Sequence, residues 1–538
     1  MASSKKILNV FVNQVGYEPK GTKYAYARGL SGQETFSLLK KDSTQVVYSA
    51  KAGTPKQDRV AGESICTLDF SDFNADGEYI IRIQAANGKT ADSVPFKIGK
   101  GLYNDIYSSS IHYFYLSRCG FKVQDPVFGH PECHAEPAVI YGTDIKKEVN
   151  GGWHDAGDYG RYIVAGSKAV MDLLLAYEGT PRAELLDEIR FELEWMLKMQ
   201  RSDGGVFHKV SCYHFCGFIK PQDEKDELVI APVSSTATAD FAGCLAFASG
   251  FFKETDSNFA DKLMAAALKA WDYLETHEDE PYKNPPEITT GGYGDWSSAD
   301  ERYFACGALF LRTGEQKYVK RAKELKAGVT DAPADPNCPW KNMWLEVFGW
   351  GMVAGYGTEL FLRAQNKIKD KNFVQDLKAS MTARADKVLS IVKDASFGTA
   401  LDKVRWGSCG QVCDDAHTLL AAYDITGNKE YYEGAKKQLD YVLGCNPMDI
   451  CYVTGFGTNT VKNPHHRPSV AAGQTMPGMV SGGPCEALYD EYARKKLEKH
   501  NLPPLQCFID HKSSYSTNEI AIYWNSTFVY VASKLKLV

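Results

Sequence analysis

The period of the hydrophobic residues changes once along the chain, near residue 99. Before that point, short runs of β-branched and aromatic residues are separated by turns of Gly, Asp and Asn at fairly regular spacing. Such runs predict strands, and their spacing is typical of a β-sandwich. The expected strands are 7–12, 24–27, 35–39, 46–48, 64–68, 78–83 and 94–98. We therefore expect residues 7–98 to form one β-sandwich domain with a structural role.

From residue 101 onward, apolar residues recur three and four positions apart, which predicts amphipathic helices. Glycines follow several of the expected helix ends, as at Gly179, Gly314 and Gly427. The predicted helices, with no strand among them, are 103–118, 163–178, 183–200, 236–252, 258–275, 299–312, 315–327, 342–366, 372–392, 411–426, 430–444 and 516–535. Because short and long connections alternate, we expect six helical hairpins in a closed ring, with the long loops gathered on one side.

The long loops are the expected place for chemistry, because functional residues concentrate on loops that a rigid scaffold carries. They are 119–162, 201–235, 276–298, 393–410 and 445–515.

The first long loop ends in the most informative stretch of the chain, residues 151–162, with the sequence GGWHDAGDYGRY. Its glycines suit a tight turn that aims side chains into a cleft. Asp155 and Asp158, held together, can position and deprotonate a water molecule. The alternative is an Asp-rich turn that caps the helix expected after Tyr162, since Asp is a favoured N-cap residue.

The same loop contains residues that suit a metal. Two thiolates and two imidazoles form a standard tetrahedral zinc set, and the candidates are Cys119, Cys133, His134 and His154. Their spacing is not that of a compact zinc finger, and a core cysteine with surface histidines is the alternative. A closed site would be structural and would fix the loop that carries the two aspartates. A rival set without a comparable link to the acidic motif is His208, Cys212, His214 and Cys216.

Two further groups of polar residues lie at expected helix starts. The first is Ser297, Asp300 and Glu301. Its acidic residues either interact favourably with the helix dipole or, together with the serine, offer oxygen ligands to calcium. Ser516 and Glu519 fit a capping box, Ser-x-x-Glu. The functional alternative is that Glu519 faces the aspartate pair across a cleft as a proton donor.

Composition narrows the classes of function. A chain of 538 residues with 44% hydrophobic and 24% charged residues is typical of a soluble protein with two or three domains. The net charge is −6 and the sequence contains no block of Lys and Arg residues, so it does not predict the basic surface that binds nucleic acid. No apolar run approaches the roughly 18 residues that span a membrane. The first residues lack the apolar stretch of a signal peptide, so we expect an intracellular protein or a mature form given a new start.

Three separated motifs, in the same order, resemble those of glycoside hydrolase family 9: DAGDYGRY at 155–162, NPHHR at 463–467 and SYSTNE at 514–519. That is a family of inverting cellulases with an (α/α)6 barrel. Residues 13–17 (NQVGY) look like the start of the immunoglobulin-like domain that precedes the barrel in one branch of the family. The resemblance implies a mainly α protein, with an immunoglobulin-like β-sandwich at 7–98 and an (α/α)6-barrel catalytic domain at 101–538.

The resemblance also implies roles for the carboxylates. Asp158 would be the general base that activates water, Asp155 would help to hold that water, and Glu519 would be the general acid. Inversion needs acid and base roughly 6.5–9.5 Å apart. The acid must hold its proton at the working pH, so its pKa must be raised. The residues that match sugar contacts of the family are His465, Arg467 and Trp406.

In the branch with the immunoglobulin-like domain, the matching zinc ligands are Cys119, Cys133, His134 and His154, which implies a structural zinc ion and no organic cofactor. Where relatives usually carry Trp-Gly-Asp after the calcium loop, this chain has Trp350-Gly351-Met352. Methionine cannot replace a carboxylate oxygen as a calcium ligand. This departure argues against calcium at the Ser297, Asp300 and Glu301 positions.

The resemblance implies endo-acting, inverting hydrolysis of β-1,4-glucosidic bonds in cellulose or related β-glucans. The alternative is an exo-acting enzyme that trims cello-oligosaccharides or glucosamine oligosaccharides, with loops 201–235 and 276–298 closing the cleft. A carbohydrate-binding protein without activity is disfavoured because all three carboxylates are present. We expect a monomer that binds β-1,4-glucan and neither nucleic acid nor membrane. Secretion is the default for an enzyme that degrades a polymer, and a cytoplasmic oligosaccharide-cleaving role is the alternative.

Overall fold

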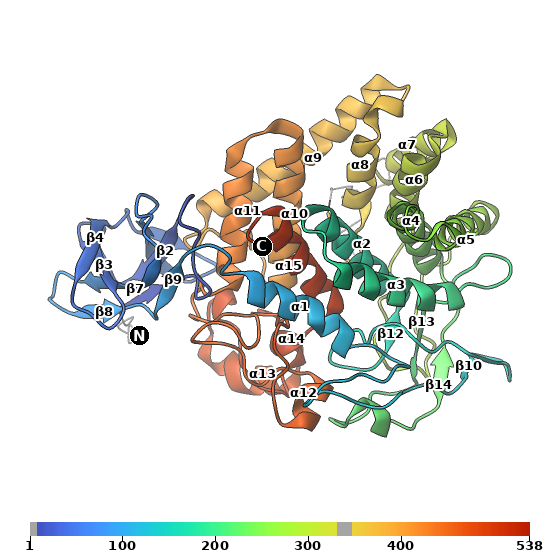
Figure 1. The fold of residues 1–538 in the computed structure, drawn as a ribbon, viewed down its shortest axis with the longest axis horizontal. Coiled ribbons are helices and arrows are strands. Elements are labelled where there is room, and N and C mark those ends of the chain that lie inside the picture. The colour runs from blue at the N-terminus through green and yellow to red at the C-terminus, as the bar shows by residue number, and fades with distance from the viewer. Residues whose placement is uncertain (1–7, 331–346) are drawn as a thin grey trace.

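The computed structural model describes residues 8–330 and 347–538, and it contains a small β-domain beside a larger helical domain (Figure 1). The strands of the small domain are β1 (Asn9–Phe11), β2 (Tyr24–Arg28), β3 (Thr35–Lys40), β4 (Val46–Lys51), β5 (Lys56–Asp58), β6 (Glu63–Asp69), β7 (Gly77–Gln84), β8 (Thr90–Asp92) and β9 (Phe96–Ile98). They form two antiparallel sheets, in the orders β1-β2-β6-β5 and β4-β3-β7-β8, with β9 paired to β7.

A separate hydrophobic core holds the two sheets together. Alternate residues of β3 and β7, such as Phe36, Leu38, Ile81 and Ile83, are fully buried, while their neighbours along each strand are more exposed. This alternation is the pattern of a sandwich, and the predicted β-sandwich is confirmed. Strands β5 and β8 escaped prediction because each is only three residues long and mostly polar.

The large domain is built from helix pairs. Its helices of ten or more residues, within the described part of the chain, are α1 (Asn104–Leu116), α2 (Ile163–Gly179), α3 (Ala183–Lys198), α4 (Ser235–Phe252), α5 (Ser257–Thr276), α6 (Ala299–Thr313), α7 (Gln316–Thr330), α8 (Ala354–Arg363), α9 (Lys371–Asp394), α10 (Ser408–Thr426), α11 (Lys429–Val442) and α15 (Ile522–Lys534). The predicted helix 342–366 begins outside the described residues. None of the described helices combines the length and the apolar character needed to cross a lipid bilayer.

Helices α2, α4, α6, α8, α10 and α15 form the inner ring, and most sequential neighbours in it pack directly against each other. The sequence explains which helix faces inward. Almost every residue of α4 is buried, whereas its partner α5 buries one face and exposes Lys262 and Lys269 on the other. A helix that is apolar all round has to lie inside, and an amphipathic one covers it. The expected (α/α)6 barrel is confirmed.

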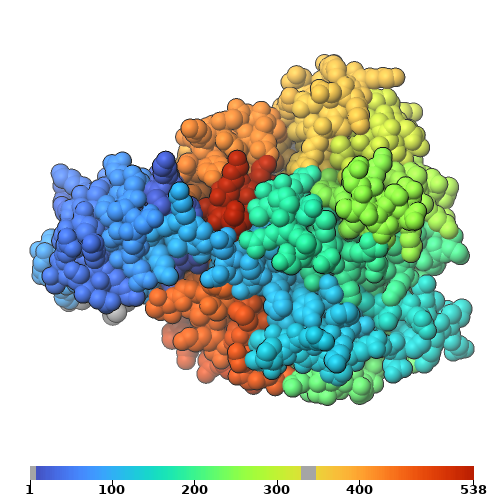
Figure 2. Space-filling view, viewed as in Figure 1, coloured from blue at the N-terminus to red at the C-terminus, as the bar shows by residue number. Residues whose placement is uncertain are grey.

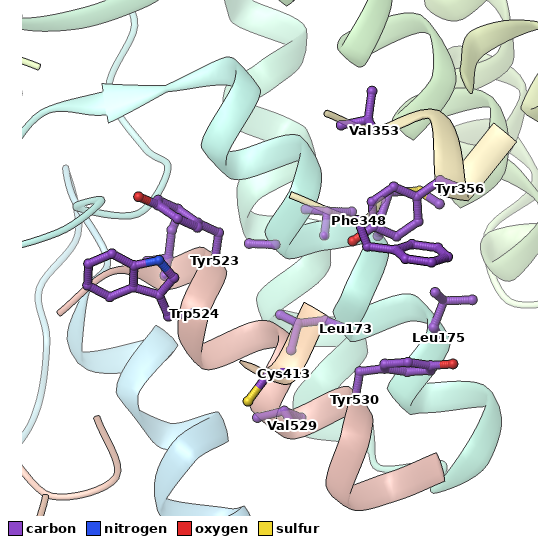
Figure 3. Packing of buried hydrophobic residues seen from close by; sticks show 14 of the residues in the cluster. Leu173, Leu175, Phe348, Val353, Tyr356, Cys413, Tyr523, Trp524, Val529 and Tyr530 are labelled. Atoms are coloured by element: carbon purple, nitrogen blue, oxygen red, sulfur yellow. The ribbon is translucent and has the colours of Figure 1, made fainter. Parts of the chain in front are cut away.

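The centre of the ring is filled by side chains from helices far apart in the sequence. Figure 3 shows Leu173 of α2, Tyr356 of α8, Cys413 of α10 and Tyr530 of α15 as members of one cluster of buried residues. Each is at most 3% exposed. The barrel is therefore a packed core, and any cleft has to lie at one of its ends.

The loops at one end of the ring contain a sheet of their own, so the prediction that this domain has no strand was wrong. Its strands are β10 (Ala138–Ile140), β11 (Lys146–Lys147), β12 (Arg161–Tyr162), β13 (Lys209–Cys212) and β14 (Leu228–Ile230), in the order β11-β10-β14-β13-β12. They lie together at the lower right of Figure 1. They escaped prediction because they are short and because β13 and β14 are buried on both faces, which removes the alternation of polar and apolar residues.

The predicted last helix, 516–535, is interrupted at Glu519. A short helix α14 (Tyr515–Asn518) precedes Glu519, whose backbone is extended, with φ −70° and ψ 164°. The capping-box interpretation of Ser516 and Glu519 was wrong: Ser516 lies inside α14, and Glu519 follows its end. Glu519 instead pairs with His465, and Ile520 pairs with Ser481, in isolated β-bridges. The loop 445–515 also contains two short helices, α12 (Arg467–Ala472) and α13 (Glu491–Leu497).

Residues 13 and 14 join the two domains. The buried Asn13 amide donates to the Asp440 carboxylate at 2.7 Å. Gln14 donates to the Asp449 carbonyl at 3.0 Å and accepts the N–H groups of Thr458 and Asn459 at 3.0 and 2.8 Å. Figure 2 shows the blue domain lying against orange segments of this region. The β-domain therefore holds one end of the long loop 445–515.

Candidate active site

Three segments distant in the sequence meet at Gly157. A Cβ atom on Gly157 would lie 2.5 Å from the His465 carbonyl oxygen and 3.2 Å from Glu519 Oε1. Real Cβ atoms do not approach a backbone oxygen so closely, so only glycine fits. The loop is fastened on both sides, since the Asp155 N–H donates to the Gly160 carbonyl at 3.0 Å and the Ile522 N–H donates to the Asp155 carbonyl at 2.8 Å.

Asp155 lies buried at the base of the site, with 1% of its surface exposed. Its Oδ2 accepts a hydrogen bond from the Tyr293 hydroxyl. Its Oδ1 has no hydrogen-bond partner within the described part of the chain. Burial raises the pKa of Asp155 well above its usual value, and the charge of Asp158 adds to the shift.

Asp158 is oriented by its own loop. One carboxylate oxygen, Oδ2, accepts the Gly160 N–H at 3.1 Å and the Tyr162 hydroxyl at 3.0 Å. Among the described residues, its other oxygen has no such bond, and 8% of the residue is exposed. Asp158 therefore presents one fixed and accessible carboxylate oxygen.

Glu519 is the third carboxyl group of the site. Burial raises its pKa well above the usual value, and the negative charges of Asp158 and Asp155 raise it further. Burial and the neighbouring negative charges both favour the neutral acid, because a second or third negative charge in the same low-dielectric site is costly. Burial therefore favours the protonated form of Glu519, and it acts on Asp155 in the same direction.

All three carboxyl groups line one cavity of about 760 Å³. Its other lining residues include many aromatic ones: Tyr162, Tyr293, Trp296, Trp350, Trp406, Tyr523 and Trp524. Trp406 is 42% exposed, and its ring centre lies 5.1 Å from that of Tyr515. Flat, partly exposed rings beside acid groups suit a ligand with apolar faces and polar edges, as a sugar has.

His465 and Arg467 lie at the junction of the segments. The His465 Nδ1 donates to the Lys512 carbonyl at 2.6 Å, which leaves Nε2 as an acceptor; burial lowers the pKa of this ring, so it stays neutral. Arg467 donates through Nη1 to the Gly157 carbonyl at 2.6 Å, and through Nε and Nη2 to the Cys216 carbonyl at 3.1 and 2.8 Å. Arg467 thus ties three loops together, and within the described residues neither side chain lines the 760 Å³ cavity.

The four predicted metal ligands come together directly behind Asp155. One ligand atom from each of Cys119, Cys133, His134 and His154 lies within 4.8 Å of the others, and all four residues are buried. His134 also contacts the Glu224 carboxylate through Nε2 at 2.9 Å. Among the described residues, no other group of histidines, cysteines and carboxylates converges in this way. The rival set is dispersed, because His208 bonds to Ser234 and His214 bonds to Thr289.

The predicted calcium ligands lie at the start of α6. The Ser297 hydroxyl donates to Asp279 at 3.2 Å, and Asp300 Oδ2 accepts the Val353 N–H at 2.9 Å. Glu301 is buried, and the pKa of its carboxyl is raised by burial and by the charges of Asp300, Asp295 and Asp240. This is a buried acidic cluster beside the cavity, with some of its oxygens already bonded to protein groups.

Sequence reasoning missed Tyr293, which lies in the third long loop and holds Asp155. The signal was present, since a tyrosine surrounded by Gly291, Gly292 and Gly294 resembles the glycine-rich setting of the Asp155 motif. Tyr293 has a positive φ of 48°, which is uncommon for a bulky residue and indicates a conformation that the surroundings impose.

A family model described as "Glycosyl hydrolase family 9" matches residues 103–532. A second model, described as "Cellulase N-terminal ig-like domain", matches residues 7–87. A cellodextrinase of Butyrivibrio fibrisolvens is 36% identical, over 97% of this chain and 99% of its own length. Endoglucanase D of Acetivibrio thermocellus is 31% identical, over 96% of this chain and 82% of its own length. A xyloglucan-specific endo-β-1,4-glucanase of Bacteroides ovatus is 30% identical, over 97% and 93%.

Solved structures give the same result. A single mutant of a thermostable endoglucanase from Alicyclobacillus acidocaldarius is 33% identical, with a TM-score of 0.89 over 98% of this chain and 99% of that one. A zinc-binding triple mutant of the family 9 endoglucanase J30 is 27% identical, with a TM-score of 0.89 over 96% and 99%.

The close approach at Gly157 generates a prediction. Gly157→Ala should lower the free energy of unfolding by about 1–3 kcal/mol, because the methyl group forces the His465 carbonyl and Glu519 apart. Gly217→Ala is the matched control, since a Cβ there meets nothing within 4 Å. Urea denaturation of both variants measures the difference. Equal stability of Gly157→Ala and the parent protein would contradict the described contact.

Proposed function

The chain belongs to glycosyl hydrolase family 9 and hydrolyses β-1,4-glucosidic bonds, and we propose that it does so as an endo-acting enzyme with inversion at the anomeric carbon. One observation carries the proposal. Asp155, Asp158 and Glu519, from two distant parts of the sequence, line the same aromatic cavity. An acid that keeps its proton beside carboxylates that can activate water is what glycoside hydrolysis requires.

In the proposed mechanism, Glu519 donates its proton to the glycosidic oxygen as the bond to the anomeric carbon breaks. Asp158 accepts a proton from a water molecule, whose oxygen attacks the opposite face of the sugar ring. The raised pKa of Glu519 supports the first role. The accessible oxygen of Asp158 supports the second, because its other oxygen is already held by Tyr162 and Gly160.

We propose that Asp155 holds the attacking water together with Asp158. Asp155 Oδ1 is buried and has no hydrogen-bond partner among residues 8–330 and 347–538, which makes it a suitable acceptor for a water hydrogen and supports this role. The hydroxyl of Tyr293 fixes Oδ2 and so leaves Oδ1 as the available oxygen.

Sugar contacts are proposed for Trp406, which lines the cavity, and for His465 and Arg467, which lie outside its lining beside Glu519 and Gly157. Trp406 is exposed at the cavity wall and suits stacking on a sugar face. His465 retains Nε2 as an acceptor. Arg467 uses three of its five N–H donors on main-chain carbonyls, which leaves two for hydroxyl groups.

We propose that the substrate is β-1,4-glucan and that the mode is endo. Two of the three relatives above are named as endo-acting enzymes, and one as a cellodextrinase. We further propose domains at 7–98 and 101–538, and a secreted monomer without nucleic-acid or membrane partners. Secretion is supported by the substrate, because a glucan polymer does not enter a cell.

We propose that Cys119, Cys133, His134 and His154 hold a structural zinc ion. The donor set fits zinc: two sulfur and two nitrogen atoms within 4.8 Å of one another suit a tetrahedral ion. The described cysteines are all free, so both thiols are available. A bound zinc ion supplies cross-linking of the loop and no chemistry of the hydrolysis. His154 precedes Asp155 directly, so a fixed His154 restrains the catalytic loop.

Calcium at Ser297, Asp300 and Glu301 has weaker support. Glu301 Oε2 is buried without a hydrogen-bond partner among the described residues, which leaves one oxygen for a cation. The Ser297 hydroxyl and Asp300 Oδ2 are already used by protein groups. Met352, which precedes Val353, offers no oxygen ligand. We therefore give calcium no part in the mechanism.

Product analysis tests the proposed function. On carboxymethyl cellulose, we expect a fast fall in viscosity, and on cellohexaose a mixture of short oligomers, with no cleavage of a chitosan hexamer. The reason is that an endo-acting enzyme binds a chain along its length and cleaves it internally. Release of only monomer or dimer at constant viscosity would establish the exo alternative, and cleavage of the chitosan hexamer alone would refute the substrate.

The role of Glu519 can be separated from that of Asp158. Glu519→Gln should lower kcat on cellohexaose by about 10²–10⁴-fold, because an amide cannot donate the proton. On 2,4-dinitrophenyl β-cellobioside the loss should be much smaller, because that leaving group needs no protonation. Asp158→Asn should be impaired on both substrates, since both need an activated water.

The pH profile gives a second measurement on the same variants. The pKa of Glu519 is raised, so the parent enzyme should lose kcat/KM as the pH rises through that value, and Glu519→Gln should lack this alkaline limb. Glu491→Gln, at an exposed position, is the control and should keep the parent profile. A parent-like rate of Glu519→Gln on cellohexaose would refute the assigned acid.

The zinc proposal predicts about one zinc ion per chain by elemental analysis. Removal by a strong chelator should lower the melting temperature, and added zinc should restore it. Cys119→Ser should lose both the metal and the response. Cys212→Ser, at a buried cysteine outside the set, should keep both. A metal-free parent with an unchanged melting temperature would overturn the assignment.

A further inference from the structure

A buried lysine lies beneath the active site. Lys209, in β13, is fully buried, with no exposed surface. It stands opposite Tyr162 of β12 in the sheet register, and its Nζ lies 5.5 Å from the centre of the Tyr162 ring. Lysine is rarely buried without specific partners, so the contacts of Lys209 indicate its role.

The Lys209 ammonium is bonded to one segment of the third long loop. Nζ donates to the Thr290 hydroxyl at 3.0 Å, the Thr290 carbonyl at 3.3 Å and the Gly291 carbonyl at 2.6 Å. The ammonium has three donors, and these are three acceptors. Burial lowers its pKa to about 7, while the charge of Asp158 acts in the opposite direction. Asp158 is thus within the electrostatic reach of Lys209.

This loop segment carries the tyrosine that holds Asp155. Tyr293 lies two residues after Gly291 in a left-handed conformation, and its hydroxyl donates to Asp155 Oδ2. His208, the neighbour of Lys209, contacts the Gly292 carbonyl through Nε2 at 3.0 Å. Two adjacent residues of the chain therefore bind successive carbonyls and impose the uncommon backbone of Tyr293.

A second path leads from Lys209 to Asp158. Tyr162, over which the ammonium lies, donates its hydroxyl to Asp158 Oδ2 at 3.0 Å. A Cβ on Gly291 would lie 3.0 Å from this hydroxyl, so the loop held by Lys209 also confines Tyr162. The rings of Tyr162 and Tyr293 pack with their centres 4.7 Å apart.

We propose that Lys209 is a positioning residue that fixes both water-side carboxylates, Asp155 through Tyr293 and Asp158 through Tyr162. Within the described residues it does not line the 760 Å³ cavity, so it acts through these two tyrosines rather than on the substrate. The inference rests on the proposed roles of Asp155 and Asp158. In this proposal, one buried lysine fixes the positions of Asp155 and Asp158, the two residues proposed to hold the attacking water.

Lys209→Met tests the proposal, because methionine keeps the length of the side chain and removes its charge and donors. We expect kcat on cellohexaose to fall by about 10–100-fold, with KM within about twofold, since the substrate contacts stay in place. The fall should be similar on 2,4-dinitrophenyl β-cellobioside, because water activation is needed there too.

The β-domain offers a matched control. Lys23 is also fully buried, and its Nζ donates to the Pro19 carbonyl at 2.8 Å, the Gly21 carbonyl at 3.1 Å and Asn74 Oδ1 at 3.3 Å. Lys23→Met should cost stability in the same way and leave kcat per folded molecule unchanged. An equal fall in kcat for both variants would show that general destabilisation is the cause and would overturn the proposal.

A double-mutant cycle with Tyr293→Phe distinguishes positioning from a local structural role. If Lys209 acts through Tyr293, Lys209→Met should reduce kcat much less in the Tyr293→Phe background than in the parent. Fully additive losses would contradict this path. If Lys209→Met does not fold, Thr290→Val removes the hydroxyl that accepts from Lys209 and that also bonds to Ser211 and the Cys212 carbonyl. This variant should still lower kcat several-fold, and parent-like kcat in Thr290→Val would then refute the proposal.

Failure of the inference can be told from failure of the proposed function. If the parent enzyme does not cleave cellohexaose, or if Asp158→Asn retains full activity, the function and the base assignment are wrong. If Asp158→Asn is inactive while Lys209→Met equals the parent in kcat, only the role of Lys209 is wrong.

Discussion

The site depends on the burial of three carboxyl groups within reach of one another's charge. In such surroundings full ionisation is unfavourable, so at least one group keeps its proton. Burial and neighbouring carboxylates raise the pKa of both Glu519 and Asp155, and the proposed mechanism assigns the retained proton to Glu519. Crowding therefore accounts for a proton donor in this site. The charge of Arg467 acts in the opposite direction and lowers the pKa of Glu519, while its N–H groups bond to main-chain carbonyls.

Crowding of this kind has to be enforced by the chain around it. Gly157 allows three segments to touch, Arg467 ties them together, and the extended backbone at Glu519 points its side chain toward the loop of Asp155. The (α/α)6 ring supplies the rigid floor, and the β-domain holds one end of the loop 445–515 through Asn13 and Gln14. Next to the aspartates, Cys119, Cys133, His134 and His154 of the loop 119–162 gather their ligand atoms within 4.8 Å of one another.

The sequence was sufficient for the architecture and for the motif residues. Helices such as α4 and α5 are recognisable because burial on all faces or on one face leaves a clear period. The sequence was insufficient where strands form by pairing between loops that are distant along the chain. Strands β12 and β13 are short and buried on both faces, so no local pattern marks them. The break at Glu519 was hidden by a capping-box pattern that the tertiary pairing with His465 overrides. Tyr293 and Lys209 were missed for a related reason, since their importance lies in partners that are far away along the chain.

The central claim is that Glu519 and Asp158 act from opposite faces of the sugar in one displacement by water. Proton NMR spectroscopy of cellohexaose during the first minutes of hydrolysis tests it most directly, by observing the anomeric configuration of the new reducing ends before mutarotation. The account predicts that the α-anomer appears first from the β-linked substrate. Initial formation of the β-anomer would contradict it, because retention requires a covalent intermediate on one of the carboxylates.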